Sequence, residues 1–297
     1  MEMLSFSNVK KRFGEKEALC GVSFCVPEHT VFGFVGQNGA GKTTAMKLIL
    51  GLLKCDEGEI FVNGERVRYG NAKTNRMIGY LPDVPEFYSY MTPEEYLAFC
   101  GEISGMRKKE IKERGKKLLQ LVGLDAKRRI GGFSRGMKQR LGIAQALLHR
   151  PKLLICDEPT SALDPAGRKE ILDILSAAKE EAAVLFSTHI LSDVEHICDE
   201  LALLHKGKIA LKGDLDKIRS VRKDAGVELE LEMEEDIQRL LLRFPFLERG
   251  NGRCLRLGEE KRLPEILFWL AESKASVLRI EKQEATLEDL FLEVTGA

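Results

Sequence analysis

A glycine-rich octapeptide between an apolar run and an amphipathic stretch constrains this chain more than any other feature. The octapeptide, GQNGAGKT at residues 36–43, directly follows the β-leaning run VFGFV at residues 31–35. Residues 42–53 then carry apolar side chains at three- and four-residue spacings, which predicts a helix. A strand, a glycine-rich loop and a helix in this order form the context in which the pattern GxxxxGK[ST] binds phosphate.

The predicted loop has the chemistry that a nucleoside triphosphate requires. Glycines let backbone N–H groups curl around phosphate oxygens, and the helix N-terminus adds the positive end of its dipole. Lys42 supplies a charge for the β- and γ-phosphates, and the Thr43 hydroxyl is a ligand for Mg²⁺. We therefore predict that ATP contacts the loop and the start of the helix, through Gly36, Gln37, Asn38, Gly39, Ala40, Gly41, Lys42, Thr43 and Thr44.

A second apolar run, residues 153–156, ends in the adjacent acids Asp157 and Glu158. A strand here would place both acids at the carboxyl edge of the sheet, beside the glycine loop. Asp157 is then expected to orient Mg²⁺ through water, and Glu158 to activate the attacking water. Solvated acids at a strand end are the alternative when this segment is taken alone.

The distribution of apolar residues predicts an α/β fold with two domains. After residue 151 apolar strands alternate with amphipathic helices, which favours a largely parallel, buried sheet. Residues 93–122 are predicted to be helical, with Thr92 as the first N-cap. Beyond residue 219 a polar segment precedes a stretch in which apolar residues alternate with glutamate. We expect one domain over residues 1–219 and a small α+β domain over 220–297.

Composition argues against several partners and compartments. Lys+Arg and Asp+Glu both number 46, and a protein that binds nucleic acid through its phosphates normally carries a basic excess, so no nucleic acid is expected. No apolar run reaches the roughly 18 residues of a membrane span, and the N-terminus lacks a signal peptide pattern. The seven cysteines are scattered without a CxxC pair, which is typical of reduced cytosolic thiols.

The segment FSRGMKQR, residues 133–140, changes what these motifs imply. It resembles the LSGGQ-type signature of ATP-binding cassette (ABC) proteins, and residues 1 to about 217 resemble the nucleotide-binding subunit of an ABC transporter. Ser134 and Gly136 fall on the serine and the second glycine of that signature. The resemblance implies that they meet the γ-phosphate of an ATP held by a second copy. A simple helix N-cap at Ser134 is the alternative for the segment alone.

Three further segments match the same family. The tetrapeptide SALD at residues 161–164 resembles the D-loop, which crosses the dimer interface and brings Asp164 near ATP. His189, after the apolar run 183–186, resembles the H-switch, which contacts the γ-phosphate and holds the attacking water. Phe13 matches the aromatic residue that stacks on adenine. A structural histidine and a core phenylalanine are the alternatives. The resemblance thus implies Glu158, His189 and Lys42 as the catalytic residues.

The chain departs from the family pattern at two places. Residues 78–83, IGYLPD, resemble the segment that leads into the Q-loop, where a glutamine senses Mg²⁺ and the membrane partner; here Asp83 stands at that place. An aspartate coordinates Mg²⁺ with a shorter reach and a negative charge. Thr43, Asp83 and Asp157 are therefore the predicted metal ligands. In the signature, Arg135 and Met137 replace the first glycine and the glutamine.

The resemblance also implies a fold and an assembly. The family fold is a P-loop cassette with a mixed sheet core, an antiparallel β subdomain and a helical subdomain. Residues 285–291, ATLEDLF, resemble the tail domain of ABC-2-type exporters, including drug and antibiotic efflux systems. The expected protein is an ATPase that dimerises, with its own copy or a homologous cassette, around two MgATP. It would drive a separate transmembrane permease from the inner face of the cell membrane, as an exporter.

A soluble ABC-type ATPase of translation or DNA repair is the alternative. Translation proteins of this type resemble two cassettes in one chain, whereas this chain has one pair of nucleotide motifs. Repair proteins carry long coiled coils between those motifs, yet only residues 43 to 156 separate Lys42 from Asp157. A P-loop GTPase is not favoured, because no NKxD-like guanine motif follows the loop. The sequence features thus favour a transport ATPase over the translation, DNA-repair and GTPase alternatives.

Overall fold

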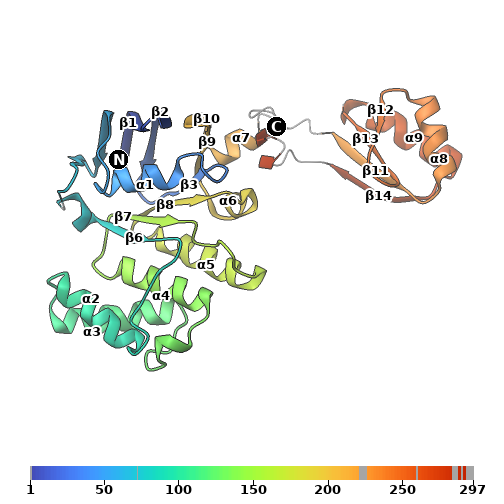
Figure 1. The fold of residues 1–297 in the computed structure, drawn as a ribbon. Coiled ribbons are helices and arrows are strands. Elements are labelled where there is room, and N and C mark those ends of the chain that lie inside the picture. Colours follow the sequence, from blue (N-terminus) through green and yellow to red (C-terminus); the bar gives the residue numbers. More distant parts are fainter. Residues whose placement is uncertain are drawn as a thin grey trace. The chain divides into compact units, whose positions relative to one another are not determined.

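The computed structural model describes residues 2–71, 73–220, 226–258, 260–282, 287, 288, 290 and 291. The described chain forms two compact units, Met1–Leu215 and Asp216–Ala297, each with its own hydrophobic core (Figure 1). Most of the polar segment before the second domain, and three positions of the tail motif (285, 286 and 289), lie outside the described residues.

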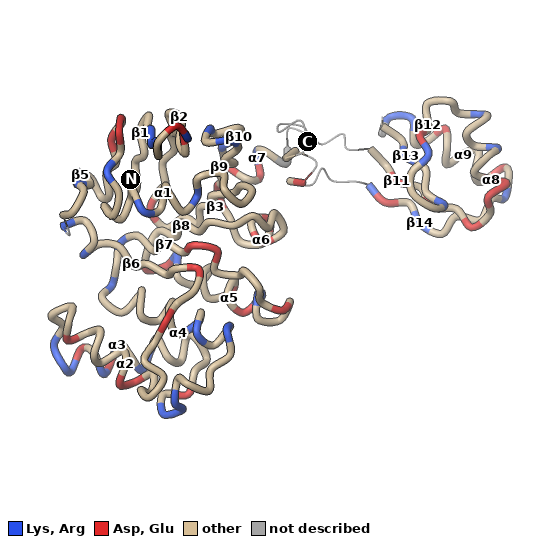
Figure 2. Tube along the Cα trace, viewed as in Figure 1, with Lys and Arg blue, Asp and Glu red and all other residues tan. Residues whose placement is uncertain are grey.

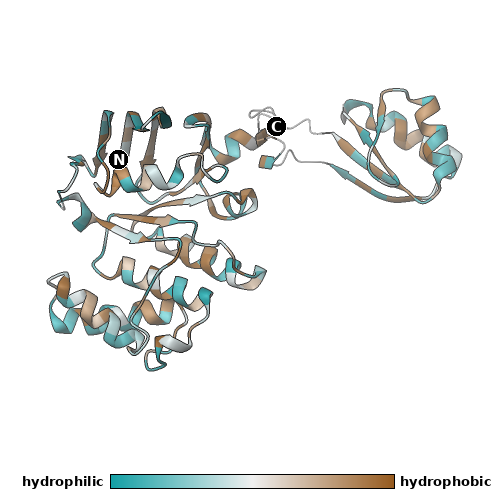
Figure 3. Cartoon of the chain, in the orientation of Figure 1, coloured by the Kyte–Doolittle hydropathy of each residue, from teal (hydrophilic) through white to brown (hydrophobic). Residues whose placement is uncertain are grey.

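The first unit is built around a six-stranded sheet in the order β10-β9-β3-β8-β7-β6. Five neighbouring strands are parallel and β10 is antiparallel to β9, which confirms the mixed sheet core. The central strands β3, β7 and β8 are buried at every residue and are largely hydrophobic, brown in Figure 3. Uninterrupted apolar strands of this kind need cover on both faces. The strands are β3 (Val31–Val35), β6 (Ile78–Leu81), β7 (Leu153–Asp157), β8 (Ala183–Thr188), β9 (Glu200–His205) and β10 (Lys208–Asp214).

An antiparallel sheet covers one side of this core. Its order is β2-β1-β4-β5, with β1 (Glu2–Phe13), β2 (Lys16–Pro27), β4 (Glu57–Val62) and β5 (Glu65–Arg66). The rings of Phe6, Phe24 and Phe34 stack at 4.9–5.0 Å and join the two sheets, with α1 (Lys42–Ile49) in the same core. Register shifts interrupt the regular pairing of β1 around Asn8, whose φ is +46°.

Helices form the rest of the first unit. α2 (Pro93–Ile103) begins with the predicted N-cap: Thr92 Oγ1 accepts from the Glu95 amide at 3.3 Å, and the Glu95 carboxylate accepts from the Thr92 amide at 2.8 Å. The remaining helices of this unit are α3 (Lys108–Leu121), α4 (Arg135–Leu147), α5 (Pro165–Ala178) and α6 (Leu191–Ile197), with short 3₁₀ turns at Thr74–Met77 and Ile130–Gly132. A further helix, α7 (Leu215–Ser220), begins at the last residue of the first unit. In the described residues no helix combines the length and apolarity that crossing a bilayer requires.

The second unit is a small α+β domain. Its antiparallel sheet has the order β12-β13-β11-β14, and the alternating residues Val227, Leu229 and Leu231 of β11 pack against the helices. The elements are β11 (Val227–Leu231), α8 (Glu234–Arg243), β12 (Leu247–Arg249), β13 (Cys254–Leu257), the 3₁₀ turn Glu260–Arg262, α9 (Leu263–Ser273) and β14 (Val277–Lys282). Acidic and basic residues are interspersed in both units, as Figure 2 shows.

Candidate nucleotide site

The glycine loop connects β3 to α1, as its sequence context predicts. Gly39 and Gly41 have φ values of +82° and +114°, which favour glycine, and Gly41 is the N-cap of α1. A Cβ at Gly41 would lie 2.6 Å from the Ala18 carbonyl oxygen, so the site also has no room for a side chain. The Gly36 amide donates to the Thr188 carbonyl at 3.2 Å, which attaches the loop to the end of β8.

Lys42 is the buried cation of the loop, with 5% of its side chain exposed. Its Nζ donates to the Gly36 carbonyl at 2.5 Å and to the Gln37 carbonyl at 3.2 Å. The same Nζ lies 3.0 Å from Glu158 Oε1, at the end of β7. The structure therefore brings together the lysine and the acid that two distant motifs predict.

Glu158 stands between Lys42 and His189. His189 Nδ1 donates to Glu158 Oε2 at 2.8 Å, so each carboxylate oxygen has one cationic or N–H neighbour. The Glu158 amide donates to the Ser187 carbonyl at 3.1 Å and contacts the Ser187 hydroxyl at the same distance. Its φ of +48° is a strained conformation for a residue other than glycine, and such residues concentrate at functional sites. The three residues form a connected cluster.

Asp157 has a partner that the sequence motifs do not indicate. Its side chain is 3% exposed, and its Oδ1 accepts a hydrogen bond from the buried Ser187 hydroxyl at 2.6 Å. The parallel register of β7 and β8 sets Asp157 opposite Ser187. The sequence feature that could have indicated this partner is the polar Ser187 near the carboxyl end of the buried strand β8. The described residues contain no cluster of three or more His, Cys, Asp or Glu that could hold a metal by themselves.

Asp83 and Arg135, the two departures from the family pattern, form an ion pair. Arg135 Nη2 donates to Asp83 Oδ1 at 3.1 Å. Burial raises the pKa of the Asp83 carboxyl above its ordinary value; Arg135 opposes this shift, and the charges of Asp157 and Glu158 add to it. Asp83 thus lies within the electrostatic field of the acids at the end of β7.

The predicted signature and D-loop residues lie at helix N-termini. Ser134 Oγ accepts from the Met137 amide at 3.3 Å and caps α4. Asp164 Oδ1 accepts from the Gly167 amide at 3.2 Å and caps α5. A Cβ at Gly136 would meet Leu163 at 3.7 Å, an ordinary contact, so packing within the chain does not require glycine there. The contacts of these residues with a second copy remain predictions.

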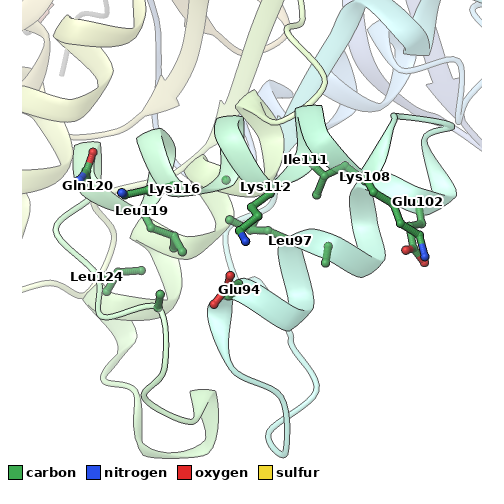
Figure 4. A pocket seen from close by; sticks show the side chains of 13 residues that line it. Glu94, Leu97, Glu102, Lys108, Ile111, Lys112, Lys116, Leu119, Gln120 and Leu124 are labelled. Atoms are coloured by element: carbon green, nitrogen blue, oxygen red, sulfur yellow. The ribbon is translucent and has the colours of Figure 1, made fainter.

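Phe13 and a separate cavity lie outside the Lys42–Glu158–His189 cluster. Phe13 ends β1 with 48% of its surface exposed, so the core alternative is wrong for this residue; Lys11 Nζ lies 5.3 Å from its ring centre. A cavity of about 570 Å³ lies between α2 and α3 (Figure 4). Apolar residues such as Leu97 and Leu119 and a row of lysines on α3 line it, and none of the predicted site residues does.

The chain is similar in sequence and in fold to known ABC transporter proteins. A sequence profile described as ABC transporter matches residues 19–161. The chain is 40% identical to the uncharacterized ABC transporter ATP-binding protein YxlF of Bacillus subtilis (strain 168), over 99% of this chain and 100% of that one. It is 34% identical to the bacitracin transport ATP-binding protein BcrA of Bacillus licheniformis, over 99% of this chain and 97% of that one.

A solved structure similar to the chain shows two cassettes together. It is described as the dimeric structure of a post-hydrolysis state of the ATP-binding cassette MJ0796 bound to ADP and Pi. The TM-score is 0.64 at 25% sequence identity, covering 72% of this chain and 99% of that one.

Proposed function

Because the chain belongs to the family of ABC transporter ATP-binding proteins, we propose that two copies close around two MgATP and drive a separate membrane permease. The activity of the family is ATP binding and hydrolysis. The cluster of Lys42, Glu158 and His189 carries the proposal for the chemistry of this chain, because a cation, a carboxylate and an imidazole meet beside a phosphate-binding loop.

Each member of the cluster has a proposed role. Lys42 neutralises the β- and γ-phosphates, and the backbone N–H groups of the glycine loop bind their oxygens. Glu158 accepts a proton from the attacking water, a step that typically contributes 10²- to 10⁴-fold in rate. His189, which donates to Glu158 at 2.8 Å, holds that carboxylate in one orientation and binds the γ-phosphate.

The residues at the loop and at β7 fit Mg²⁺ held mainly by the nucleotide. Mg²⁺ typically uses one or two carboxylates together with substrate phosphates rather than a complete protein cage. Asp157 is buried, and the Ser187 hydrogen bond fixes its orientation, as outer partners of metal ligands do. We assign Thr43 and Asp157 to the ion, which would neutralise charge on the phosphates; Asp83 is a further candidate, although its carboxylate pairs with Arg135.

A substitution at Gly136 provides a test of the proposed dimer. Alanine has a higher helix propensity than glycine by about 1 kcal/mol, and a methyl group at 136 would meet only an ordinary contact within the chain. Gly136→Ala is therefore expected to leave the melting temperature unchanged or raised. If the backbone at 136 approaches the second copy's ATP, the same methyl group blocks it, and ATPase activity falls about tenfold or more, the effect of losing roughly 1.4 kcal/mol.

The matched control for this test is Gly115→Ala, on α3. A Cβ at Gly115 would also meet only ordinary contacts, the nearest at 3.9 Å. This variant is expected to leave the melting temperature unchanged or raised, as in Gly136→Ala, and to keep the ATPase activity. Full activity of Gly136→Ala, measured under the same conditions, would contradict the assignment of this residue to the dimer.

The proposed permease contact is the segment 84–92, which follows β6. Its side chains Val84, Tyr88 and Tyr90 are 60%, 49% and 64% exposed, and exposed apolar groups that gather in one segment typically mark a protein interface. The bacitracin transport relative supports an exporter, and both named relatives support transport over translation or DNA repair. The chain would then dock on the cytoplasmic face of the cell membrane.

Tyr90→Glu is expected to release the chain from membranes, because it places a charge in the proposed contact. The measurement is the amount of tagged chain, and of a multi-span protein purified with it, from detergent-solubilised membranes of cells that express the protein naturally. Tyr69→Glu is the control, since Tyr69 is equally exposed, at 65%, in the turn that follows β5. The purified Tyr90→Glu chain must still hydrolyse ATP, so that its loss from membranes is not caused by misfolding. Equal recovery from membranes for both variants would contradict this contact.

A further inference from the structure

The loop after β6 follows one face of α4 for two helical turns. Arg135, Gln139 and Gly142 are spaced four and three residues apart, so they share that face. Gln139 is fully buried, and its Nε2 donates to the Asp83 carbonyl at 2.6 Å. A Cβ at Gly142 would overlap the side chain of Leu81, the last residue of β6, and would lie 3.5 Å from Pro85 in the loop. The backbone of the loop is therefore fixed to the middle of α4, and the Asp83–Arg135 ion pair extends this contact to the helix N-terminus.

The charge of Arg135 is unfavourable without Asp83. A helix N-terminus carries a partial positive charge and favours acidic residues, but α4 has no acidic residue in its first turn and begins with arginine. Asp83, from a different segment, supplies the missing negative charge at 3.1 Å from the guanidinium. The two side chains that replace a glutamine and a glycine of the family pattern thus compensate each other.

We propose that Asp83 and Arg135 act as a positioning pair that holds the first turn of α4, with Ser134, in the place where it meets the second copy's ATP. This inference rests on the proposed dimer. Asp83 also interacts electrostatically with Asp157 and Glu158. The pair therefore connects the nucleotide site of one chain with the motif that this chain presents to its partner.

A double-mutant cycle in the full chain tests the pair, because coupled residues give non-additive effects. The background is Glu158→Gln, in which ATP-dependent dimers are expected to accumulate. Asp83→Ala and Arg135→Ala are each expected to weaken ATP-dependent dimerisation about tenfold, because each dimer loses two exposed pairs that contribute a factor of about three each. The double variant is expected to show the same tenfold loss rather than a hundredfold one. Sedimentation velocity over a range of ATP concentrations measures the dimer.

Two readouts separate positioning from a general structural defect. Binding of a fluorescent ATP analogue to the Arg135→Ala monomer, at protein concentrations too low for dimers, is expected to stay unchanged because Lys42 and its loop are intact. The control cycle uses Glu59 and Arg66, an ion pair of 2.8 Å with similar exposure on the antiparallel sheet, and is expected to leave dimerisation unchanged.

Additive losses would overturn the inference, because Asp83 would then act on the metal and Arg135 on the phosphate independently. A single variant without effect on dimerisation would overturn it as well. If the Glu158→Gln parent itself forms no dimer with ATP, the proposed dimer fails. If the parent dimerises and all its variants dimerise equally, the positioning pair alone is wrong.

Discussion

Replacing Glu158 by glutamine is expected to lower ATP hydrolysis roughly 100- to 10,000-fold, the usual contribution of a general base, while ATP binding persists. The amide cannot accept a proton from water, but it has almost the same shape as the carboxylate. In the structure both carboxylate oxygens have neighbours, Lys42 at 3.0 Å and His189 at 2.8 Å. The substitution therefore removes the charge and the base without opening a cavity.

The measurement combines steady-state phosphate release with size-exclusion chromatography in the presence of MgATP. Stalled hydrolysis should leave two ATP molecules between two copies, so the variant is expected to elute as a dimer with ATP and as a monomer with ADP. Glu17→Gln provides the matched control, because Glu17 makes a surface ion pair with Arg12 at 2.6 Å, outside the cluster. Phosphate release at the unsubstituted rate would show that Glu158 is not the base.

Replacing Lys42 by alanine is expected to weaken nucleotide binding about 10- to 100-fold and to abolish turnover. A hydrogen bond to a charged group contributes roughly 1.5–3 kcal/mol, and Lys42 is the buried cation of the loop. Its loss also leaves Glu158, whose side chain is 13% exposed, without its nearest cation. The remaining carboxylate would repel the γ-phosphate, which weakens binding further.

Isothermal titration calorimetry with an ATP analogue measures this loss, and thermal unfolding shows whether the variant is folded. Lys47→Ala is the control, because Lys47 is exposed in the last turn of the same helix. Both substitutions remove one positive charge and place an alanine in the same helix, so only the position differs. Equal affinity for the two variants would refute the assignment of the glycine loop to phosphate.

The sequence alone predicts the parts of the site that local chemistry determines. Gly39 and Gly41 have positive φ values, and Lys42 begins a helix. The conformation of the loop can therefore be predicted from about a dozen consecutive residues. The adjacency of β7 and the loop also follows, because polar residues at the carboxyl ends of parallel strands meet at one edge. These contacts depend on backbone geometry that neighbouring residues fix.

Contacts that depend on long-range register are not predictable in this way. Asp157 meets Ser187 because β7 and β8 align at that pair, and no spacing within either strand specifies the alignment. The Asp83–Arg135 pair likewise requires the loop after β6 to follow α4. In the second unit, the alternation in β11 predicts a half-buried strand, but its placement between β13 and β14 requires the folded sheet.

The left-handed backbone at Glu158 has a consequence for stability. A non-glycine residue in such a conformation costs on the order of 1–3 kcal/mol, and glycine would adopt it freely. Glycine at this position would therefore relieve the strain but remove the carboxylate that we assign as the base. The cost in stability is thus tied to the position of the proposed base, which lies between Lys42 and His189.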